Sequence, residues 1–278
     1  MDATPAPEAS GTSPPKPTTT PTASATEKPQ PIILTFQADT EWANPGDTVV
    51  LTWQTVGAGS AMLYKMMPSG QLPADGIPLP PSGSRAYRIP ESDQNWASFL
   101  LYVWDDADNH TMATAEVRLH CSHAWFFDPP EEDICPTEPL PSKAAEQRFE
   151  HGTMVWVERE DAIYVLYSDP VYTTRWARVE DRWEEGMPVQ DPELQPPEGL
   201  QQPRRGFGLV WRAHPQVREQ LGWAVDSETG YATVIQRTTR YKYNAWYLLA
   251  LDGTVWHLGP EGGSWSAITP DAISVSPP

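Results

Sequence analysis

Hydrophobic and polar residues alternate with a period of two along much of the first half of this chain. The alternation is clearest over residues 48–53, where Val49, Leu51 and Trp53 are separated by side chains that point to the other face of a β-strand. Similar short runs recur between turns rich in Gly, Pro, Asp and Asn, at residues 32–36, 61–66, 85–89, 96–104 and 111–119. About seven short strands in some ninety residues are typical of an antiparallel β-sandwich.

A second set of strands is predicted beyond residue 150. Two apolar runs, 153–157 and 163–167, surround a charged turn in the pattern of a β-hairpin. The same order of glycine, apolar residues and tryptophan recurs at 208–211 and 253–256. Asp252 followed by glycine is a type I′ hairpin signal. Three further strands are predicted at 231–236, 243–251 and 254–258.

Two helices are predicted in this second part of the chain. The first covers residues 141–151, with Gly152 as its stop signal. The second begins at Pro215, a residue favoured in the first helical turn, and ends before Gly222. Residues 168–206 are predicted to be a long surface loop. The second part is therefore predicted to be a small, Trp-rich α+β fold in which β-structure dominates.

The first 31 residues contain 8 Pro and 7 Thr and no bulky apolar side chain after Met1. Such a segment cannot offset the entropy of ordering, so it is predicted to be a disordered linker. No apolar segment of a secretory signal follows Met1. The linker is nevertheless typical of a stalk left after an export signal or lipid anchor has been removed, which favours an extracellular or cell-surface location. A cytosolic protein with a flexible tail is the alternative.

The formal charge of −18 at pH 7 is spread along the chain rather than gathered in a tail. Nucleic-acid binding needs clustered Lys and Arg to neutralise phosphates, so nucleic acid is not predicted as a partner. The longest apolar runs, 97–104 and 245–251, have the length of strands and fall short of the roughly 20 residues of a membrane-spanning helix. We therefore predict no membrane span.

Cys121 and Cys135 are the two cysteines of the chain. We predict that they form a disulfide, because closing a loop of about 15 residues stabilises a fold by roughly 3 kcal/mol in the chain-entropy model. A metal site that also uses His120 and His123 is the sharper alternative, but its spacing matches no common structural zinc pattern. Free thiols are the third option. No metal and no cofactor are predicted.

Trp125, Phe126 and Phe127 lie inside the loop between the two cysteines. Three adjacent side chains cannot all point to one face of a strand. We therefore expect at least one of them to be exposed or to stack on the neighbouring domain, at the seam between two domains.

The sequence of residues 44–53, NPGDTVVLTW, resembles the A–B turn and B strand of bacterial immunoglobulin-like domains, and FLLYVW at 99–104 resembles their F strand. The resemblance covers residues 32–120 and implies an immunoglobulin-like β-sandwich. In exported bacterial proteins such domains are spacers, adhesion modules or assembly units. Neither cysteine lies on the expected B or F strand, so the intersheet disulfide of antibody domains is absent.

A second resemblance covers residues 144–236. This segment is similar to the F-x-x-G-x-(I)-x-W…W…L-G-x-P pattern of LGFP-type repeats, through RFEHGTMVW with IYVLY, then VW and the helical VREQLGWA. It is also similar to an uncharacterised C-terminal module of exported bacterial proteins. One unit is present, and its signature tetrapeptide is LGWA. The family implies contact with cell-envelope polysaccharide and supplies no residue set to carry over.

These observations predict four segments. They are a disordered linker at 1–31, an immunoglobulin-like β-sandwich at 32–120, a Trp-rich LGFP-like module at 121–270 and a tail at 271–278.

No catalytic constellation is found in the sequence. No G-x-S-x-G motif occurs, and the histidines show no helical i, i+4 pair. Gly206 and Gly208 lead into a predicted strand, whereas a phosphate loop opens a helix. The acidic turn 105–109 is either a calcium site or a solvated turn. With 37 acidic residues, adjacent carboxylates arise freely, so an enzyme is not predicted and a glycan-active hydrolase is the less favoured option.

Thirteen tryptophans are the compositional excess that bears on function. Flat indoles stack on sugar rings, and packing in a core is the alternative use of each. The candidate ligand-binding residues are Trp183, Trp211, Trp223 and Trp265. We predict an extracytoplasmic, non-catalytic adhesion protein of the cell surface that contacts cell-envelope or matrix polysaccharide or a surface protein. A structural subunit that self-associates into a surface layer or filament is the alternative.

Overall fold

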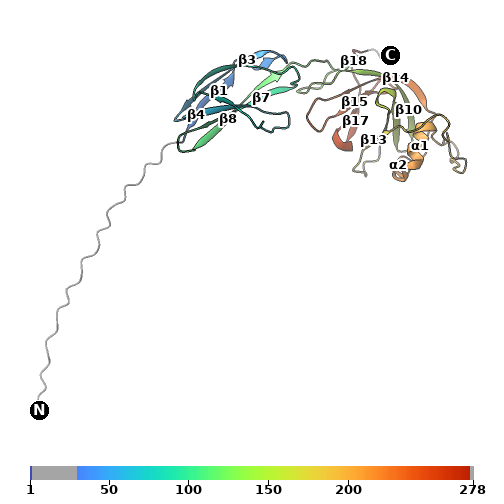
Figure 1. The fold of residues 1–278 in the computed structure, drawn as a ribbon. Helices are drawn as coiled ribbons and strands as arrows, with labels where there is room; N and C mark the ends of the chain where they lie inside the picture. The colour runs from blue at the N-terminus through green and yellow to red at the C-terminus, as the bar shows by residue number, and fades with distance from the viewer. Residues whose placement is uncertain (2–29, 276–278) are drawn as a thin grey trace.

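The computed structural model describes Met1 and residues 30–275, and these residues form a mainly β structure (Figure 1). The predicted linker at 1–31 lies outside the described residues except for Met1, Gln30 and Pro31. Within the described part of the chain, no helix is long and apolar enough to cross a membrane. We call residues 30–120 the first region and residues 121–275 the second region.

The first region is built from two sheets around a shared core. One sheet has the strand order β1 (Ile32–Ala38), β3 (Thr48–Val56), β6 (Gly83–Arg88). The other has the order β2 (Trp42–Ala43), β8 (His110–Leu119), β7 (Trp96–Trp104), β4 (Ser60–Lys65), β5 (Ile77–Leu79). Leu51, Phe99 and Val117 are fully buried and belong to one cluster that joins both sheets. The strands predicted from the alternating pattern are confirmed, because a strand with one buried face produces that pattern.

The second region contains one antiparallel sheet of eight strands. Their spatial order is β13 (Trp176–Glu180), β12 (Ala162–Tyr167), β11 (Gly152–Val157), β10 (Leu140–Phe149), β14 (Thr229–Arg237), β15 (Trp246–Leu249), β16 (Val255–Leu258), β17 (Trp265–Ile268). The smaller elements are the paired strands β9 (Phe127–Asp128) and β18 (Ala272–Ile273) and the 3-10 turns η1 (Glu158–Glu160) and η2 (Pro260–Gly262). The predicted hairpin is confirmed as β11 and β12, with Trp156 opposite Ile163.

The eight-stranded sheet curls until its two edges meet, so that it is nearly a barrel. Hydrogen bonds to backbone carbonyls join the β12–β13 edge to the β16–β17 edge. They run from Trp176 Nε1 to Gly259 O at 2.8 Å, from Trp265 Nε1 to Tyr167 O at 2.9 Å, and from Arg175 N to Gly262 O at 2.7 Å. These bonds occupy edge groups that the strand ladders leave unpaired.

Two helices, α1 (Arg205–Ala213) and α2 (Pro215–Leu221), cover one face of this sheet (Figure 1). Phe207, Trp211 and Leu221 pack with buried side chains of β11 and β12. The prediction of α2 from its proline and glycine is therefore confirmed.

The other predicted helix, 141–151, is wrong, because these residues form strand β10 and the turn after it. β10 lies between β11 and β14, and both of its faces are covered: Ala144 is 3% exposed and Ala145 is 6% exposed. Burial on both faces removes the period of two from the sequence. The helix was predicted from the spacing of four between Ala145 and Phe149. Residues four apart lie on the same face of a strand as well as of a helix, so this spacing does not distinguish the two.

The predicted strand at 208–211 is also wrong, because these residues belong to α1. Phe207, Val210 and Trp211 are buried at the i, i+3, i+4 spacing of a helix face. The motif of glycine, apolar residues and tryptophan thus forms a helix here and a strand at 253–256. The predicted loop at 168–206 contains strand β13, which was missed.

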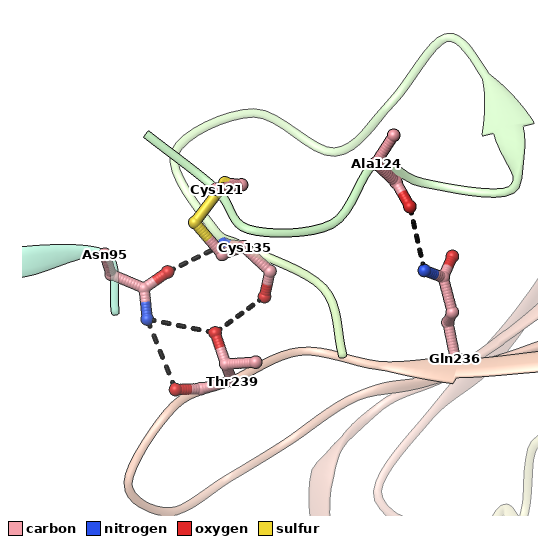
Figure 2. The surroundings of a disulfide bond; sticks show 6 residues. All are labelled: Asn95, Cys121, Ala124, Cys135, Gln236 and Thr239. Carbon is pink, nitrogen blue, oxygen red and sulfur yellow. Dashed lines mark hydrogen bonds between the residues drawn. A yellow bond between two sulfur atoms is a disulfide. The ribbon is translucent and has the colours of Figure 1, made fainter. Parts of the chain in front are cut away.

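The aromatic run in the disulfide loop is buried as a whole, so none of its side chains is exposed, and Trp125 lines a pocket together with Trp96 and Leu119 of the first region, where a seam was expected. Trp125, Phe126 and Phe127 are 7%, 0% and 3% exposed and pack on the outer side of β14, β15 and β16. Most of the loop is irregular, so the alternation of a strand does not apply to it. Gln236 holds it to the sheet: its Nε2 donates to the carbonyl of Ala124 at 2.9 Å (Figure 2). Its Oε1 accepts from Phe126 N at 2.8 Å.

One asparagine joins the two regions (Figure 2). The Nδ2 of Asn95 donates to the carbonyl and the hydroxyl of Thr239, each at 3.2 Å, and its Oδ1 accepts from Cys135 N at 2.7 Å. The Thr239 hydroxyl donates to the carbonyl of Cys135 at 2.8 Å. The predicted disulfide between Cys121 and Cys135 is confirmed and anchors this point. We call this arrangement the Asn95 clasp.

Replacing Gly262 by alanine is expected to destabilise the second region more than the matched change Gly253→Ala. Both glycines have positive φ, 74° and 85°, so both changes carry a backbone cost of about 1–2 kcal/mol. A Cβ at residue 262 would lie 2.6 Å from the carbonyl oxygen of Trp176, whereas nothing lies within 4 Å of a Cβ at residue 253. Urea unfolding should show a further loss of at least about 1 kcal/mol for Gly262→Ala. Equal losses would contradict tight closure of the sheet.

Removing the Asn95 side chain is expected to lower the free energy of unfolding by about 2–3 kcal/mol, because Cys135 N–H is left buried without a partner. Asn95→Gly tests the side chain alone, since glycine tolerates the φ of 65°. Asp108→Gly, at an exposed turn with φ 61°, is the control. Hydrogen exchange of the Cys135 amide should be at least about tenfold faster in Asn95→Gly. An unchanged exchange rate would show that the clasp does not protect this amide.

Candidate functional site

The four candidate tryptophans lie in three places. Trp265 on β17 uses its indole N–H to close the sheet. Trp211 on α1 is 0% exposed and donates Nε1 to the carbonyl of Gly222 at 2.8 Å. Trp223 packs against Trp211, with ring centroids 4.9 Å apart. Trp183, just after β13, lines a pocket of its own. The structure therefore brings together Trp211 and Trp223 and keeps the other two apart from them.

Trp223 is half-buried beside a cleft of about 440 Å³. The guanidinium group of Arg218 lies over the ring of Trp211, 5.4 Å from its centroid. Because Trp211 is fully covered, a ligand in this cleft would meet the edge of Trp223 rather than a stacked pair of indoles. Trp211 is therefore a core residue in this structure.

The pocket at Trp183, which we call the Trp183 pocket, has a volume of about 200 Å³. Its lining comes from β11, β12, α1 and the segments that follow β13 and precede β14. The lining residues are Trp156, Ile163, Asp181, Trp183, Arg205, Gly206, Phe207 and Glu228. Strand pairing and helix packing thus bring together residues that are more than seventy positions apart in the sequence.

The start of α1 requires a glycine beside the pocket. A Cβ on Gly206 would lie 2.6 Å from Oδ1 of Asp181, so a larger residue would displace that carboxyl group. Asp181 also holds the local backbone, because its Oδ1 accepts a hydrogen bond from the backbone N–H of Trp183 at 3.1 Å. This bond sets the direction of the chain at Trp183.

Two hydrogen-bond donors of the Trp183 pocket have no partner within the described structure. Nε1 of Trp156 and Nε1 of Trp183 are both shielded from solvent and make no hydrogen bond to the described residues. A buried indole N–H normally finds an acceptor, and an unpaired one points to a water or a ligand. Both residues line the pocket, so a molecule bound there is a candidate partner for these two buried groups.

The same pocket is lined by two carboxyl groups, the half-buried Asp181 and the more exposed Glu228. Burial raises the pKa of Asp181, although the N–H of Trp183 opposes this, and burial also raises the pKa of Glu228, against the effect of Arg205. Nη1 of Arg205 lies 3.9 Å from Oε1 of Glu228. Carboxyl groups held in this way are acceptors when ionised and donors when protonated.

Indole N–H donors, carboxyl acceptors and flat aromatic rings in one small pocket match the surface of a sugar ring. Each sugar hydroxyl both donates and accepts a hydrogen bond, and the C–H faces of the ring stack on aromatic side chains. Two carboxyl groups that flank a glycosidic bond, one of them with a raised pKa, are also the groups used in glycoside hydrolysis. Hydrolysis is therefore the chemical alternative to binding at this pocket.

Sequence reasoning found Trp183 and missed the other residues of the pocket. Trp156 was assigned to a hairpin, and Asp181 was one of many adjacent acids. Glu228 is likewise one of the 37 acidic residues of the chain. Nothing in their spacing along the chain distinguishes them, because the strand order decides that they meet.

The other candidate chemistry is accounted for by local contacts. In the acidic turn, Oδ1 of Asp105 accepts from the N–H groups of Ala107 at 2.8 Å and Asn109 at 3.0 Å. Among the residues that the structure describes, no group of three or more His, Cys, Asp or Glu has the geometry to hold a metal ion. The disulfide uses both cysteines of the alternative metal site.

The chain was compared with known proteins. No protein-family model matches this sequence. No curated protein is significantly similar to it. These comparisons therefore lend no support to the function proposed below.

The raised pKa of Asp181 predicts a pH-dependent difference in stability. When the folded-state pKa exceeds the unfolded value, the folded protein holds the extra proton between the two values, so stability falls as pH rises through that window. Asp181→Asn should therefore gain stability relative to the unmodified protein as pH rises above the ordinary value of 3.8. Urea unfolding between acidic and neutral pH measures this gain.

Asp252→Asn is the control of opposite sign. Hydrogen bonds from Thr254 lower the pKa of Asp252, so its contribution is present above the ordinary value of 3.8 and is lost as pH falls through the lowered value. This variant should therefore lose stability relative to the unmodified protein as pH rises. The same trend in both variants would contradict the burial assigned to Asp181.

Proposed function

We propose that this protein is an extracytoplasmic, non-catalytic surface protein that binds polysaccharide, and that the Trp183 pocket holds one sugar ring. The observation that carries the proposal is the pair of buried, unpartnered indole N–H groups in a pocket that is also lined by the carboxyl groups of Asp181 and Glu228. A sugar hydroxyl accepts from the indoles of Trp156 and Trp183 and donates to Asp181 or Glu228. This arrangement satisfies buried groups that otherwise cost free energy.

The size of the pocket supports a terminal or branching sugar as the ligand. A volume of about 200 Å³ is below the 300–1,000 Å³ typical of sites for drug-sized ligands. One ring fills such a space, whereas the interior of a linear glycan needs an open groove. The recognised unit is therefore the exposed end or branch of a cell-envelope or matrix polysaccharide.

The disulfide and the two resemblances support the location and the roles of the regions. Disulfides persist in oxidising compartments, so the Cys121–Cys135 bond favours a protein exposed outside the cytoplasm. The three- and five-stranded sheets of the first region support a spacer of the immunoglobulin-like kind. The second region is the binding module, as the LGFP-like pattern implies.

A second candidate function is self-association into a surface layer or filament. β1 is an edge strand, and it exposes Ile32 and Leu34, each 54% exposed, next to Val56, which is 56% exposed. Val56 lies opposite Ile32 in the β1–β3 ladder, on the inner strand, so the edge strand itself exposes Ile32 and Leu34. Exposed apolar edge strands favour pairing with another copy.

Removing the indole of Trp183 is expected to weaken glycan binding by about tenfold or more, a loss of roughly 1.4 kcal/mol or more. The measurement is retention on immobilised mannan, xylan, cellulose and chitin, followed by titration with the retained glycan. Trp183→Phe keeps the flat ring but lacks the N–H, and it should bind with intermediate affinity. Trp223→Ala is the matched control and should bind like the unmodified protein.

Three outcomes would contradict binding at the Trp183 pocket. These are no retention of the unmodified protein, equal retention of Trp183→Ala, and release of reducing sugar that is lost in Glu228→Gln. The last outcome would replace binding by hydrolysis. Thermal unfolding of each variant separates loss of binding from loss of the fold.

Charge at the β1 edge tests the second candidate. Leu34→Lys should abolish any concentration-dependent increase in mass, because a charged edge strand resists pairing. Size-exclusion chromatography with light scattering measures the mass, and Met112→Lys, at a side chain 56% exposed on β8, is the control. A monomer at every concentration would exclude self-association through this edge.

A further inference from the structure

A wide groove lies between the two regions, beside the Asn95 clasp. Its volume is about 980 Å³, compared with about 200 Å³ for the Trp183 pocket. One wall is formed by residues near 65–70 and 92–98 of the first region, and the other by residues 237–244, between β14 and β15. We call it the interregion groove.

We propose that the interregion groove binds a segment of an anionic polysaccharide, a chain of uronic acids. This site is separate from the Trp183 pocket and recognises a different chemical class. The proposal rests on the charges, the exposed aromatic rings and the rigidity of the groove.

Positive charge in the groove is not neutralised by the protein. Arg237, Arg240 and Lys242 are all exposed, and none of them is in an ion pair with another described residue. No Asp or Glu occurs between Glu228 and Asp252. The chain as a whole has a formal charge of −18, whereas this segment carries a positive charge. Such a surface attracts anions at short range.

Of the two acidic residues on the opposite wall, Asp93 is in an ion pair and Glu116 is exposed. Oδ2 of Asp93 lies 2.8 Å from Nζ of Lys65, and both side chains are largely buried. Oε1 of Glu116 accepts from the hydroxyl of Ser98 at 3.1 Å. The groove is lined by two carboxylates, those of Asp93 and Glu116, and by four cations, Lys65, Arg237, Arg240 and Lys242, so an excess of positive charge remains for an external anion.

Two exposed tyrosines stand among these cations. Tyr241 is 60% exposed and Tyr243 is 59% exposed, although large aromatic side chains are usually shielded. Nζ of Lys242 lies 5.6 Å from the ring centroid of Tyr241. A sugar ring stacks on a tyrosine while its carboxylate pairs with a neighbouring Arg or Lys, so this alternation fits uronic acids.

The segment that carries these side chains is held in one shape. The hydroxyl of Thr238 donates to Oδ1 of Asn244 at 3.1 Å, and the N–H of Arg240 donates to the same oxygen at 2.8 Å. The Asn95 clasp fixes Thr239 against the first region (Figure 2). Preorganised walls lower the entropy cost of binding a flexible chain.

Uronic acids explain the groove better than a polyphosphate does. Aromatic rings among Arg and Lys also bind single-stranded nucleic acid. The disulfide favours the extracytoplasmic location proposed above, and the choice of a polysaccharide over a nucleic acid rests on that proposed location. Nucleic acid is therefore an outcome of the test and not the proposal.

The test is binding of the full chain to soluble polygalacturonate, with dextran as the neutral control. We expect the affinity for polygalacturonate to fall as the NaCl concentration rises, because salt screens the attraction between charges. Dextran carries no charge and should not bind in the groove. The double variant Arg240→Glu, Lys242→Glu should bind polygalacturonate at least tenfold more weakly. Tyr241→Ala, Tyr243→Ala should also weaken binding, but should leave the salt dependence unchanged.

Two controls separate this site from general charge and from the Trp183 pocket. Arg88→Glu, Lys143→Glu reverses two exposed charges outside the groove, 69% and 74% exposed, and should leave the affinity unchanged. Trp183→Ala should also bind polygalacturonate normally. The two binding tests are therefore independent. A negative result for the Trp183 pocket leaves the proposal for the groove intact, and a negative result for the groove leaves the proposal for the Trp183 pocket intact.

Three results would overturn the proposal. The first is no binding of polygalacturonate by the unmodified protein. The second is an equal loss in the Arg88→Glu, Lys143→Glu control. The third is binding of an oligothymidylate as tight as that of polygalacturonate, which would assign the groove to polyphosphates.

Discussion

Two indole N–H groups hold the edges of the eight-stranded sheet together, and the position of the Trp183 pocket depends on that closure. An open sheet leaves backbone groups unpaired at each edge. Here Trp176 spans the gap from β13, and Gly262 is the residue small enough to let the two edges approach. Asp181 and Trp183 follow β13 directly. Anchoring this strand therefore sets where their side chains meet α1, and part of the tryptophan excess serves the fold rather than a ligand.

The second constraint is the Asn95 clasp. A single side chain donates to Thr239 and accepts from Cys135, so it links the first region to the disulfide loop and to the end of β14 in one network. A buried network of this kind is rigid when every member has a partner. The interregion groove lies beside this point, which gives its two walls a fixed relation although they come from separate sheets.

The two proposed sites differ in the chemistry of the ligand that each would bind. The Trp183 pocket is small and shielded and offers paired donors and acceptors, which suits one neutral ring. The interregion groove is wide, exposed and positive in a strongly acidic protein, which suits a charged chain. Negative charge over the rest of the surface repels polyanions, so the groove gains selectivity from its surroundings as well as from its own cations.

Local sequence pattern determined most of the strands, helix α2 and the disulfide, because a strand with one buried face shows a period of two and capping residues mark a helix over a few positions. It did not determine β10, whose two buried faces erase that period, or α1, whose glycine and tryptophan also fit a strand. The candidate site divides in the same way. Trp183 could be selected by residue type, but its partnership with Trp156, Asp181 and Glu228 was decided only by strand order and sheet closure. Tertiary structure also decided that Trp211 is covered, because burial depends on contacts between segments that no local pattern records.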